Sequence, residues 1–262
     1  MIRKPKSIQS IYLYLVLGNT LAASFIWGIN TIFLLDAGLS NFEAFLANAF
    51  FTAGMVVFEV PTGIVADTFG RRVSYLLGAF TLATSTLLYL FMWQIHGPFW
   101  GWAVSSILLG LGFTFFSGAL EAWLVDALHA TNFKGNLDGV FAKAQMVGGA
   151  AMLTGSVAGG VIAQFTNLGI PYILRALGLF INFATAFFLM KDLGFDIDLR
   201  TCQEAIKKFW RRYKRLWQWQ EELIKTATEF GYVDLPLLGQ SRQFPGGKPG
   251  VALMVNEICN LP

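Results

Sequence analysis

The decapeptide GIVADTFGRR, which starts at Gly63 and ends at Arg72, lies between two long apolar runs. Gly63 and Gly70 permit a close helix approach and a turn with unusual backbone angles. Asp67 can form charge-assisted hydrogen bonds to a guanidinium group or to a helix N-terminus. Arg71 and Arg72 are typical of a loop on the cytoplasmic side of a membrane. The decapeptide therefore predicts a short charged hairpin that joins two membrane-spanning helices.

The composition of the whole chain is also that of a membrane protein. Of its 262 residues 55% are hydrophobic, 15% are aromatic and only 13% are charged, and the mean hydropathy is +0.55. These values lie outside the range of a soluble domain of this length. The net charge of +3 is small for this length and gives no indication of nucleic-acid binding.

Six apolar runs are long enough to cross a bilayer, which takes about 20 residues per helix. They cover residues 11–35, 42–66, 73–94, 99–125, 140–165 and 171–190. The sequence therefore predicts an all-α fold, a bundle of six transmembrane helices over residues 1–195. Residues 196–262 form a separate tail, for which we expect an amphipathic helix and an irregular or small β-hairpin segment.

The basic residues predict how this bundle is oriented. The connections 36–41, 95–98 and 166–170 carry no Lys or Arg. The other side of the predicted bundle carries Arg3, Lys4, Lys6, Arg71, Arg72, Lys134 and Lys191. By the positive-inside rule both termini face the cytoplasm, and we expect a multi-pass protein of the plasma (inner) membrane. The first apolar run is too long for a signal peptide and is interpreted as a retained helix.

The pattern Gly-x-x-x-Asp-x-x-Gly-Arg-Arg within FEVPTGIVADTFGRR, residues 58–72, resembles the loop between helices two and three of the major facilitator superfamily. Thr68 departs from that pattern, which usually has Arg or Lys there. The resemblance covers residues 1–195 and implies a transporter whose two six-helix halves rock around a central cavity. No further apolar run follows Met190, so we expect the second half to be a missing partner.

The resemblance implies that this loop forms a gate, whose residues are Gly63, Asp67, Gly70, Arg71 and Arg72. Two further acids, Asp126 and Glu59, join this predicted gate. Asp126 ends the run SGALEAWLVD, which resembles the fourth helix of the drug-efflux-like branch of the superfamily. From that position Asp126 can reach Arg71 or Arg72. Glu59 can pair with the same arginines or face the cavity, and we favour the gate-forming role.

Glu121, Arg175 and Asn30 are the candidates for a substrate or proton pathway, since polar groups within a bilayer are costly. Glu121 lies five residues before Asp126, about 140° around a helix, so the two acids face different directions. We interpret Glu121 as a cavity-facing proton carrier, with a simple ion pair to Lys143 as the equal alternative. For Arg175 we favour a side chain that extends to the lipid headgroups.

The fifth run contains GGAAMLTGSVAGG, residues 148–160, whose small residues allow helix backbones to approach closely. Within it, Gly155, Ser156, Gly159 and Gly160 resemble the antiporter signature of the superfamily. Ser156 replaces the proline that normally bends this helix, which weakens the antiporter interpretation.

The tail has a basic amphipathic pattern. This pattern by itself predicts a helix that lies on a surface of anionic lipid. Several sequence motifs of the tail also resemble part of the polymerase domain of family A DNA polymerases. The motifs are Gly231-Tyr232-Val233, Gly239-x-x-Arg242 and Asn260-x-Pro262. The metal-binding aspartates of that family are absent from the segment, so we expect no polymerase activity. Arg242 and Lys248 are the candidate nucleic-acid contacts, and we expect them to be solvated and nucleic acid to be an unlikely partner.

These observations predict a transporter, truncated to one half, that resembles proton-coupled efflux carriers of small amphipathic molecules. Its partners are the lipid bilayer and the transported molecule. The alternatives are a chimeric reading frame without autonomous activity and a tail with residual DNA binding. No metal cluster, phosphate-binding loop or catalytic grouping is visible, so we expect no cofactor, no metal and no enzymatic activity.

Overall fold

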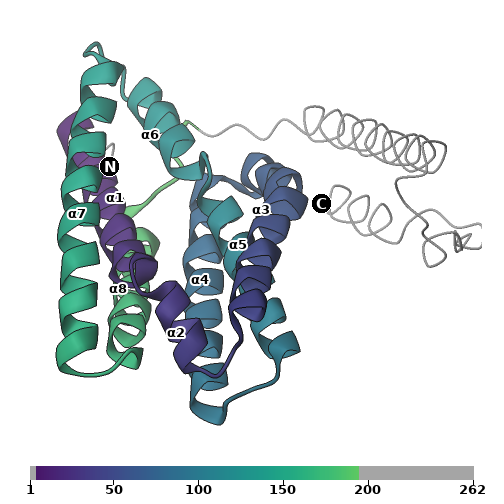
Figure 1. Ribbon diagram of the computed structural model, residues 1–262. Coiled ribbons are helices and arrows are strands. Elements are labelled where there is room, and N and C mark those ends of the chain that lie inside the picture. The colour runs from purple at the N-terminus through teal and green to yellow at the C-terminus, as the bar shows by residue number, and fades with distance from the viewer. Residues whose placement is uncertain (1–3, 195–262) are drawn as a thin grey trace, which may run out of the picture. The chain divides into compact units, whose positions relative to one another are not determined.

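The computed structural model describes residues 4–194, and these form eight α-helices without a strand (Figure 1). The helices are α1 (Pro5–Trp27), α2 (Asn30–Asp36), α3 (Asn41–Phe69), α4 (Arg71–Ile95), α5 (Phe99–Phe116), α6 (Ala119–Ala130), α7 (Leu137–Phe165) and α8 (Gly169–Leu189). The predicted amphipathic helix and hairpin of the tail, with Arg242 and Lys248, lie outside the described residues.

Six segments of the described chain are long and apolar enough to span a membrane, which confirms the predicted six-helix all-α fold. The fourth of these segments, Phe99–Ala130, consists of α5 and α6 together. Two of the predicted apolar runs were expected to form one continuous helix each, and this prediction is wrong. The first is interrupted between Trp27 and Asn30, and the fourth is interrupted at Ser117 and Gly118.

Glycine occurs at both interruptions. Gly118 has φ +72°, a left-handed conformation that glycine adopts without the steric cost other residues meet. Its carbonyl oxygen already accepts from the Ala122 N–H, so α6 starts as a new helix with its own direction. Gly28 follows α1, where low helix propensity favours a helix end.

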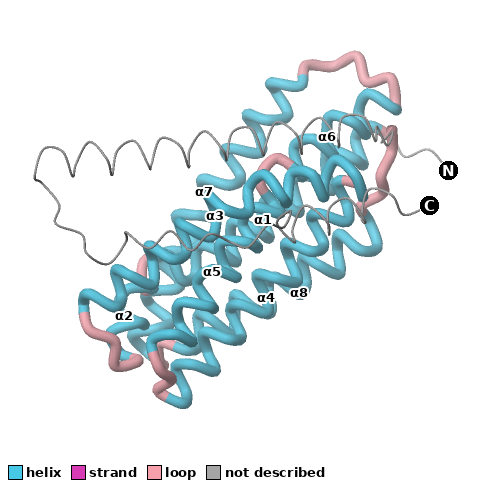
Figure 2. Tube along the Cα trace, turned by 90° about the vertical axis from the view of Figure 1, so that its right-hand side faces the viewer, coloured by secondary structure: helices cyan, strands magenta, loops and turns pink. Residues whose placement is uncertain are grey.

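The six spans pack in an open row rather than a closed ring. α3 packs on α5, α5 on α4, α4 on α8, α8 on α1 and α1 on α7, so α3 and α7 are the end members (Figures 1 and 2). Both end members expose large apolar side chains, including Phe45 and Val56 on α3 and Leu153 and Phe165 on α7. Such surfaces suit contact with lipid or with another protein.

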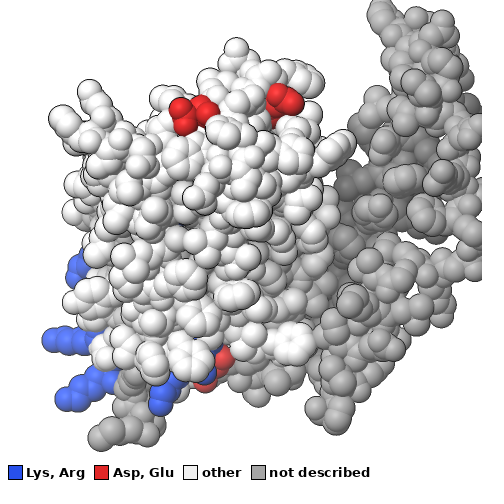
Figure 3. All heavy atoms as spheres, turned by 90° about the horizontal axis from the view of Figure 1, so that it is seen from below, with Lys and Arg blue, Asp and Glu red and all other residues white. Residues whose placement is uncertain are grey.

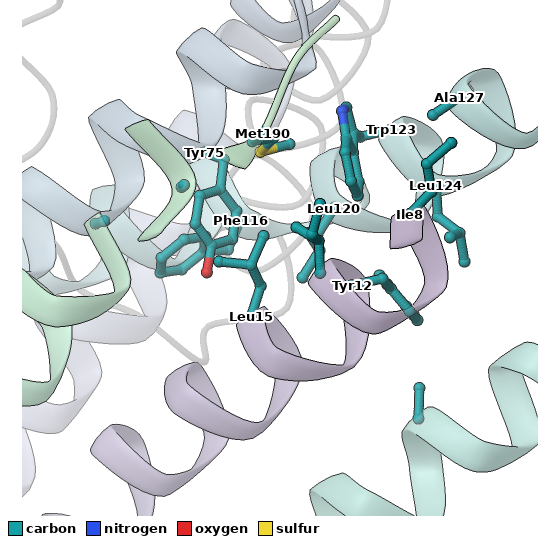
Figure 4. Packing of buried hydrophobic residues seen from close by; sticks show 14 of the residues in the cluster. Ile8, Tyr12, Leu15, Tyr75, Phe116, Leu120, Trp123, Leu124, Ala127 and Met190 are labelled. Carbon is teal, nitrogen blue, oxygen red and sulfur yellow. The ribbon is translucent and has the colours of Figure 1, made fainter. Parts of the chain in front are cut away.

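Two clusters of buried apolar side chains hold the row together. One includes Leu15, Tyr75 and Trp123 (Figure 4), and the other is built around Phe33 and Trp102. In the second cluster the Phe33 ring stacks on Tyr172 at 3.9 Å between centroids, which holds α2 against α8. The short helix α2 is therefore fixed to the bundle although it is separated from α1.

Charge divides the two ends of the bundle. We call the end with Arg71 and Arg72 the arginine end and the other the opposite end. The connections 37–40, 96–98 and 166–168 at the opposite end contain no Lys or Arg. Figure 3 views this end, and most of the face is uncharged, with Asp and Glu near one margin and Lys and Arg, beside a further acid, along the other.

The small residues of α7 differ in their surroundings. A methyl group on Gly155 would collide with Ser24 Oγ, and one on Gly159 would collide with the Phe25 carbonyl oxygen, both on α1. Among the described residues no atom lies within 4 Å of the same position on Gly160, so the described structure does not contain the predicted packing contact there. Gly63 on α3 likewise faces open space, so the close approach predicted there is absent from the described structure.

Arg175 is buried in the interior, with 1% of its surface exposed, so the predicted extension to lipid headgroups is wrong. It lies six residues after the start of α8, about 9 Å along the helix. Its Nε donates to Thr86 Oγ1 at 3.0 Å, and its guanidinium lies 5.9 Å from the centroid of the Phe113 ring. Its Nη2 has no hydrogen-bond partner among the described residues, and no described carboxylate pairs with it.

Adjacent glycines of α7 provide a matched test of the α1–α7 contact. Gly159→Ala should lower the thermal midpoint of the purified protein, because overpacking a close contact costs about 1–3 kcal/mol. Gly160→Ala should leave the midpoint unchanged or raise it slightly, since alanine favours helix and the added methyl meets nothing. Equal midpoints for the two variants would contradict this packing.

The buried guanidinium predicts an unusual response to mutation. An ion buried without a counter-ion costs several kcal/mol, so Arg175→Met should leave the thermal midpoint unchanged or raise it. Thr86→Val should lower it, because the charge then loses its described acceptor. A loss of more than about 2 kcal/mol in Arg175→Met would show that the charge is satisfied in a way this structure does not contain.

Candidate functional site

The hairpin between α3 and α4 is a single residue, Gly70. Its φ of +100° lies where side chains are strained, as the sequence predicted for an unusual turn. The turn places Asp67 at the end of α3 beside Arg71 at the start of α4. Arg71 Nη1 donates to Asp67 Oδ1 at 2.5 Å, a charge-assisted hydrogen bond across the turn.

Arg71 also faces a third helix. Its Nε lies 3.8 Å from Asp126 Oδ2 on α6, the contact that the sequence led us to expect for Asp126. This Nε has no hydrogen bond among the described residues, so the contact is electrostatic. The side chains of Arg71, Asp67 and Asp126 are 24%, 41% and 34% exposed. Exposed pairs of this kind contribute little stability each, so their value is in fixing three helix ends relative to one another.

Arg72 turns to α8 instead. Its Nη2 donates to the Phe187 carbonyl oxygen at 2.6 Å, and its guanidinium lies 5.4 Å from the centroid of the Phe187 ring. The backbone N–H of Arg72 donates to Asp192 Oδ1 at 3.0 Å. Arg72 is therefore bound to α8 and to the segment after it by both its side chain and its backbone.

Asp192 was not predicted from the sequence. The one feature that could have indicated it is its position just past the sixth apolar run, on the same side as the arginines. Its carboxylate is partly withdrawn from water, and this burial raises the pKa of Asp192 above its ordinary value. The Arg72 N–H and the charges of Arg72 and Arg71 act in the lowering direction, with smaller effect, and Asp126 acts in the raising direction.

We call Asp67, Arg71, Arg72, Asp126 and Asp192 the latch cluster. Its members come from α3, α4, α6 and the segment after α8, and all lie at the arginine end. Glu59 is not a member. It is exposed on α3, and its carboxylate forms no ion pair with the arginines in the described structure, so that predicted pairing is wrong.

A pocket of about 340 Å³ is lined by α1, α4, α5, α6 and α7. Two of its lining residues, Tyr75 and Glu121, are close in sequence to Arg71 and Asp126 of the latch cluster. Its polar lining residues are Tyr12, Asn19, Thr20, Tyr75, Glu121 and Gln145. Glu121 is the acidic residue of this lining. The apolar part of the lining includes Phe116 and Leu120, which Figure 4 shows next to Tyr75 and Tyr12.

Glu121 occupies the first turn of α6, where the helix dipole favours a negative charge. It forms no ion pair with Lys143 in the described structure, so the simple pairing is wrong. Tyr75 accepts a hydrogen bond from Asn182 Nδ2 on α8 at 3.0 Å, and its side chain is fully buried. The pocket thus combines one acidic side chain, that of Glu121, with uncharged lining residues.

The three predicted pathway residues do not lie together. Glu121 lines the pocket, whereas neither Arg175 nor Asn30 does. Asn30 starts α2, donates to Asn48 Oδ1 at 3.2 Å and accepts from the Tyr172 hydroxyl at 2.8 Å. It therefore connects α2 to α3 and α8 at the opposite end, away from the pocket.

Comparisons with known proteins agree with this architecture. The sequence model of the Major Facilitator Superfamily matches residues 13–226, beyond the boundary predicted at residue 195. The chain is also similar to an uncharacterized MFS-type transporter of Methanocaldococcus jannaschii, with 25% identity over 152 residues, which is 58% of this chain and 37% of that relative. The matched stretch therefore spans less than half of the relative, and the polymerase resemblance of the tail stays a prediction. With six apolar spans and a family match over most of its length, the chain belongs to the Major Facilitator Superfamily of membrane transporters.

Proposed function

We propose that this chain forms one half of a transporter that exports small amphipathic molecules in exchange for protons. A second six-helix half would complete the path. The observation that carries the proposal is the pocket lined by Glu121, its acidic residue, and by other residues of α4 and α6, the helices that carry Arg71 and Asp126. The arginine end would face the cytoplasm, because Arg and Lys are retained on that side of a membrane.

Glu121 suits the role of proton carrier because no described cation holds its carboxylate. A carboxylate held in an ion pair would have to break that pair before it could bind a proton. Glu121 can instead exchange a proton for a substrate cation, since either one neutralises its negative charge.

The lining favours amphipathic molecules with a positive charge. Tyr12 and Phe116 border the pocket with aromatic rings, and Met152 offers a polarizable apolar contact. Glu121 provides the complementary negative charge. A molecule with an apolar body and a cationic group would satisfy both parts of the lining at once.

The latch cluster would act as the gate at the cytoplasmic end. Arg71 is placed between Asp67 and Asp126, so separating α3 from α6 would break one of its two contacts. Each contact is weak, which suits a gate that must open and close repeatedly. Glu59 and Gly63, which are not among these contacts, are left out of this gate.

Glu121→Gln tests the proposal. Vesicles that contain the variant should lose export of a cationic dye such as ethidium driven by a pH gradient, by at least about tenfold, because glutamine cannot carry the proton. Glu121→Asp should retain part of the activity and shift its pH profile. Asp138→Asn, an exposed acid at the arginine end outside the pocket, should transport normally.

Dye binding to the purified variants separates binding from coupling. Glu121→Gln should bind the cationic dye more weakly than the wild type, and a neutral analogue of the dye equally well. Wild-type transport with unchanged pH dependence in Glu121→Gln would rule out Glu121 as the proton carrier.

A further inference from the structure

We propose that Asp192 is a positioning residue of the latch cluster, which fixes the start of α4 against the end of α8 so that Arg71 reaches Asp126. The consequence for transport rests on the function proposed above. The positioning itself can be measured without any substrate.

The first step is that α4 and α8 cap one another. The N-terminus of a helix leaves backbone N–H groups without partners, and the cap residue of α4, Gly70, has no side chain to supply one. Asp192 Oδ1 accepts from the Arg72 N–H at this position, 3.0 Å away. A carboxylate there is also favoured by the helix dipole.

The second cap runs the other way. The carbonyl groups in the last turn of a helix are not all satisfied within it, and the last turn of α8 contains no basic residue. Arg72 Nη2 donates to the Phe187 carbonyl oxygen at 2.6 Å and so supplies the missing charge. Arg72 thus caps the end of α8, and Asp192, which follows α8, caps the start of α4. The two residues are 120 positions apart along the chain.

The turn between α3 and α4 is shaped around this carboxylate. A methyl group on Gly70 would lie 2.8 Å from Asp192 Oδ2. The pattern Gly-Arg-Arg therefore requires glycine for two reasons, the positive φ and the space that Asp192 occupies.

The segment that carries Asp192 is itself held on both sides. Met190 is fully buried, and Trp123 Nε1 on α6 donates to the Lys191 carbonyl oxygen at 2.7 Å. A methyl group on Gly194 would lie 2.9 Å from the Asp126 carbonyl oxygen, so this segment runs directly beside the helix that carries Asp126. Residues 190–194 therefore connect the start of α4 with α6.

Helices α4 and α6 each carry one residue of the Arg71–Asp126 contact and at least one residue that lines the pocket. Tyr75 follows Arg71 by one turn of α4, and Glu121 precedes Asp126 on α6, so both lining residues move with the latch cluster. Loss of the Asp192 cap should let the start of α4 move away from α6. The wall of the pocket would then open towards the arginine end.

The test measures access to the pocket. A single reporter, Gly149→Cys, is placed on the lining in a background with Cys202→Ser and Cys259→Ser, and a membrane-impermeant maleimide is applied from the arginine side of sealed vesicles. Asp192→Ala and Arg71→Ala should each raise the labelling rate at least about threefold, and the double variant should be no faster than the faster single variant. Asp138→Ala is the matched control and should label as the wild type does.

Conservative variants keep the test decisive if Asp192→Ala fails to fold. Asp192→Asn retains an oxygen that can accept from the Arg72 N–H, so its rate should lie between those of the wild type and Asp192→Ala. A lower thermal midpoint with wild-type labelling would show a merely structural role and overturn the proposal. So would multiplicative effects of Asp192→Ala and Arg71→Ala.

Because labelling needs neither substrate nor proton, this test is independent of Glu121. Coupled labelling effects together with normal transport in Glu121→Gln would reject the proton carrier and keep the role of Asp192. Independent labelling effects of Asp192→Ala and Arg71→Ala, together with defective transport in Glu121→Gln, would reject the role of Asp192 and keep Glu121 as the proton carrier.

Discussion

The contact of Arg71 with two carboxylates on two other helices is the interaction on which the functional end of this bundle depends. Asp67, 2.5 Å away, lies in the last turn of α3, and Asp126, 3.8 Å away, lies on α6, so one guanidinium connects two helices that are far apart along the chain. Neither contact contributes much stability, because all three side chains are partly exposed. Their importance is geometric. Within a bundle held mainly by apolar packing, charges of opposite sign fix which helix ends meet.

Helix α6 connects this contact to the pocket. It is only 12 residues long and is separated from α5 by Ser117 and the left-handed Gly118, so its direction is not dictated by α5. Glu121 in its first turn lines the pocket, and Asp126 further along faces Arg71. A charge change at one acid can therefore be transmitted to the other by movement of one short helix. The caps between Arg72 and Asp192 give that movement a fixed reference at the start of α4.

Local features of the sequence predicted much of this structure. The lengths of the apolar runs gave six spans, and glycine before two arginines gave the turn with a positive φ at Gly70. Helical spacing separated Glu121 from Asp126. What could not be predicted depended on tertiary neighbours. The burial of Arg175 follows from how α8 faces α4 and α5, and Asp192 acquires its role from a helix start 120 positions away. Gly155 and Gly160 look alike in sequence, yet only the first is opposed by α1.

Hydrogen–deuterium exchange of the protein in lipid nanodiscs, compared between the wild type and Arg71→Ala, tests the central claim most directly. If Arg71 holds α6 in place, exchange should increase along 119–130, including the turn that contains Glu121, as well as around residues 67–72. The increase should not extend to α2, which is held at the opposite end by Tyr172 and Trp93. An increase confined to residues 67–72, with α6 unchanged, would show that the latch cluster and the pocket are not connected.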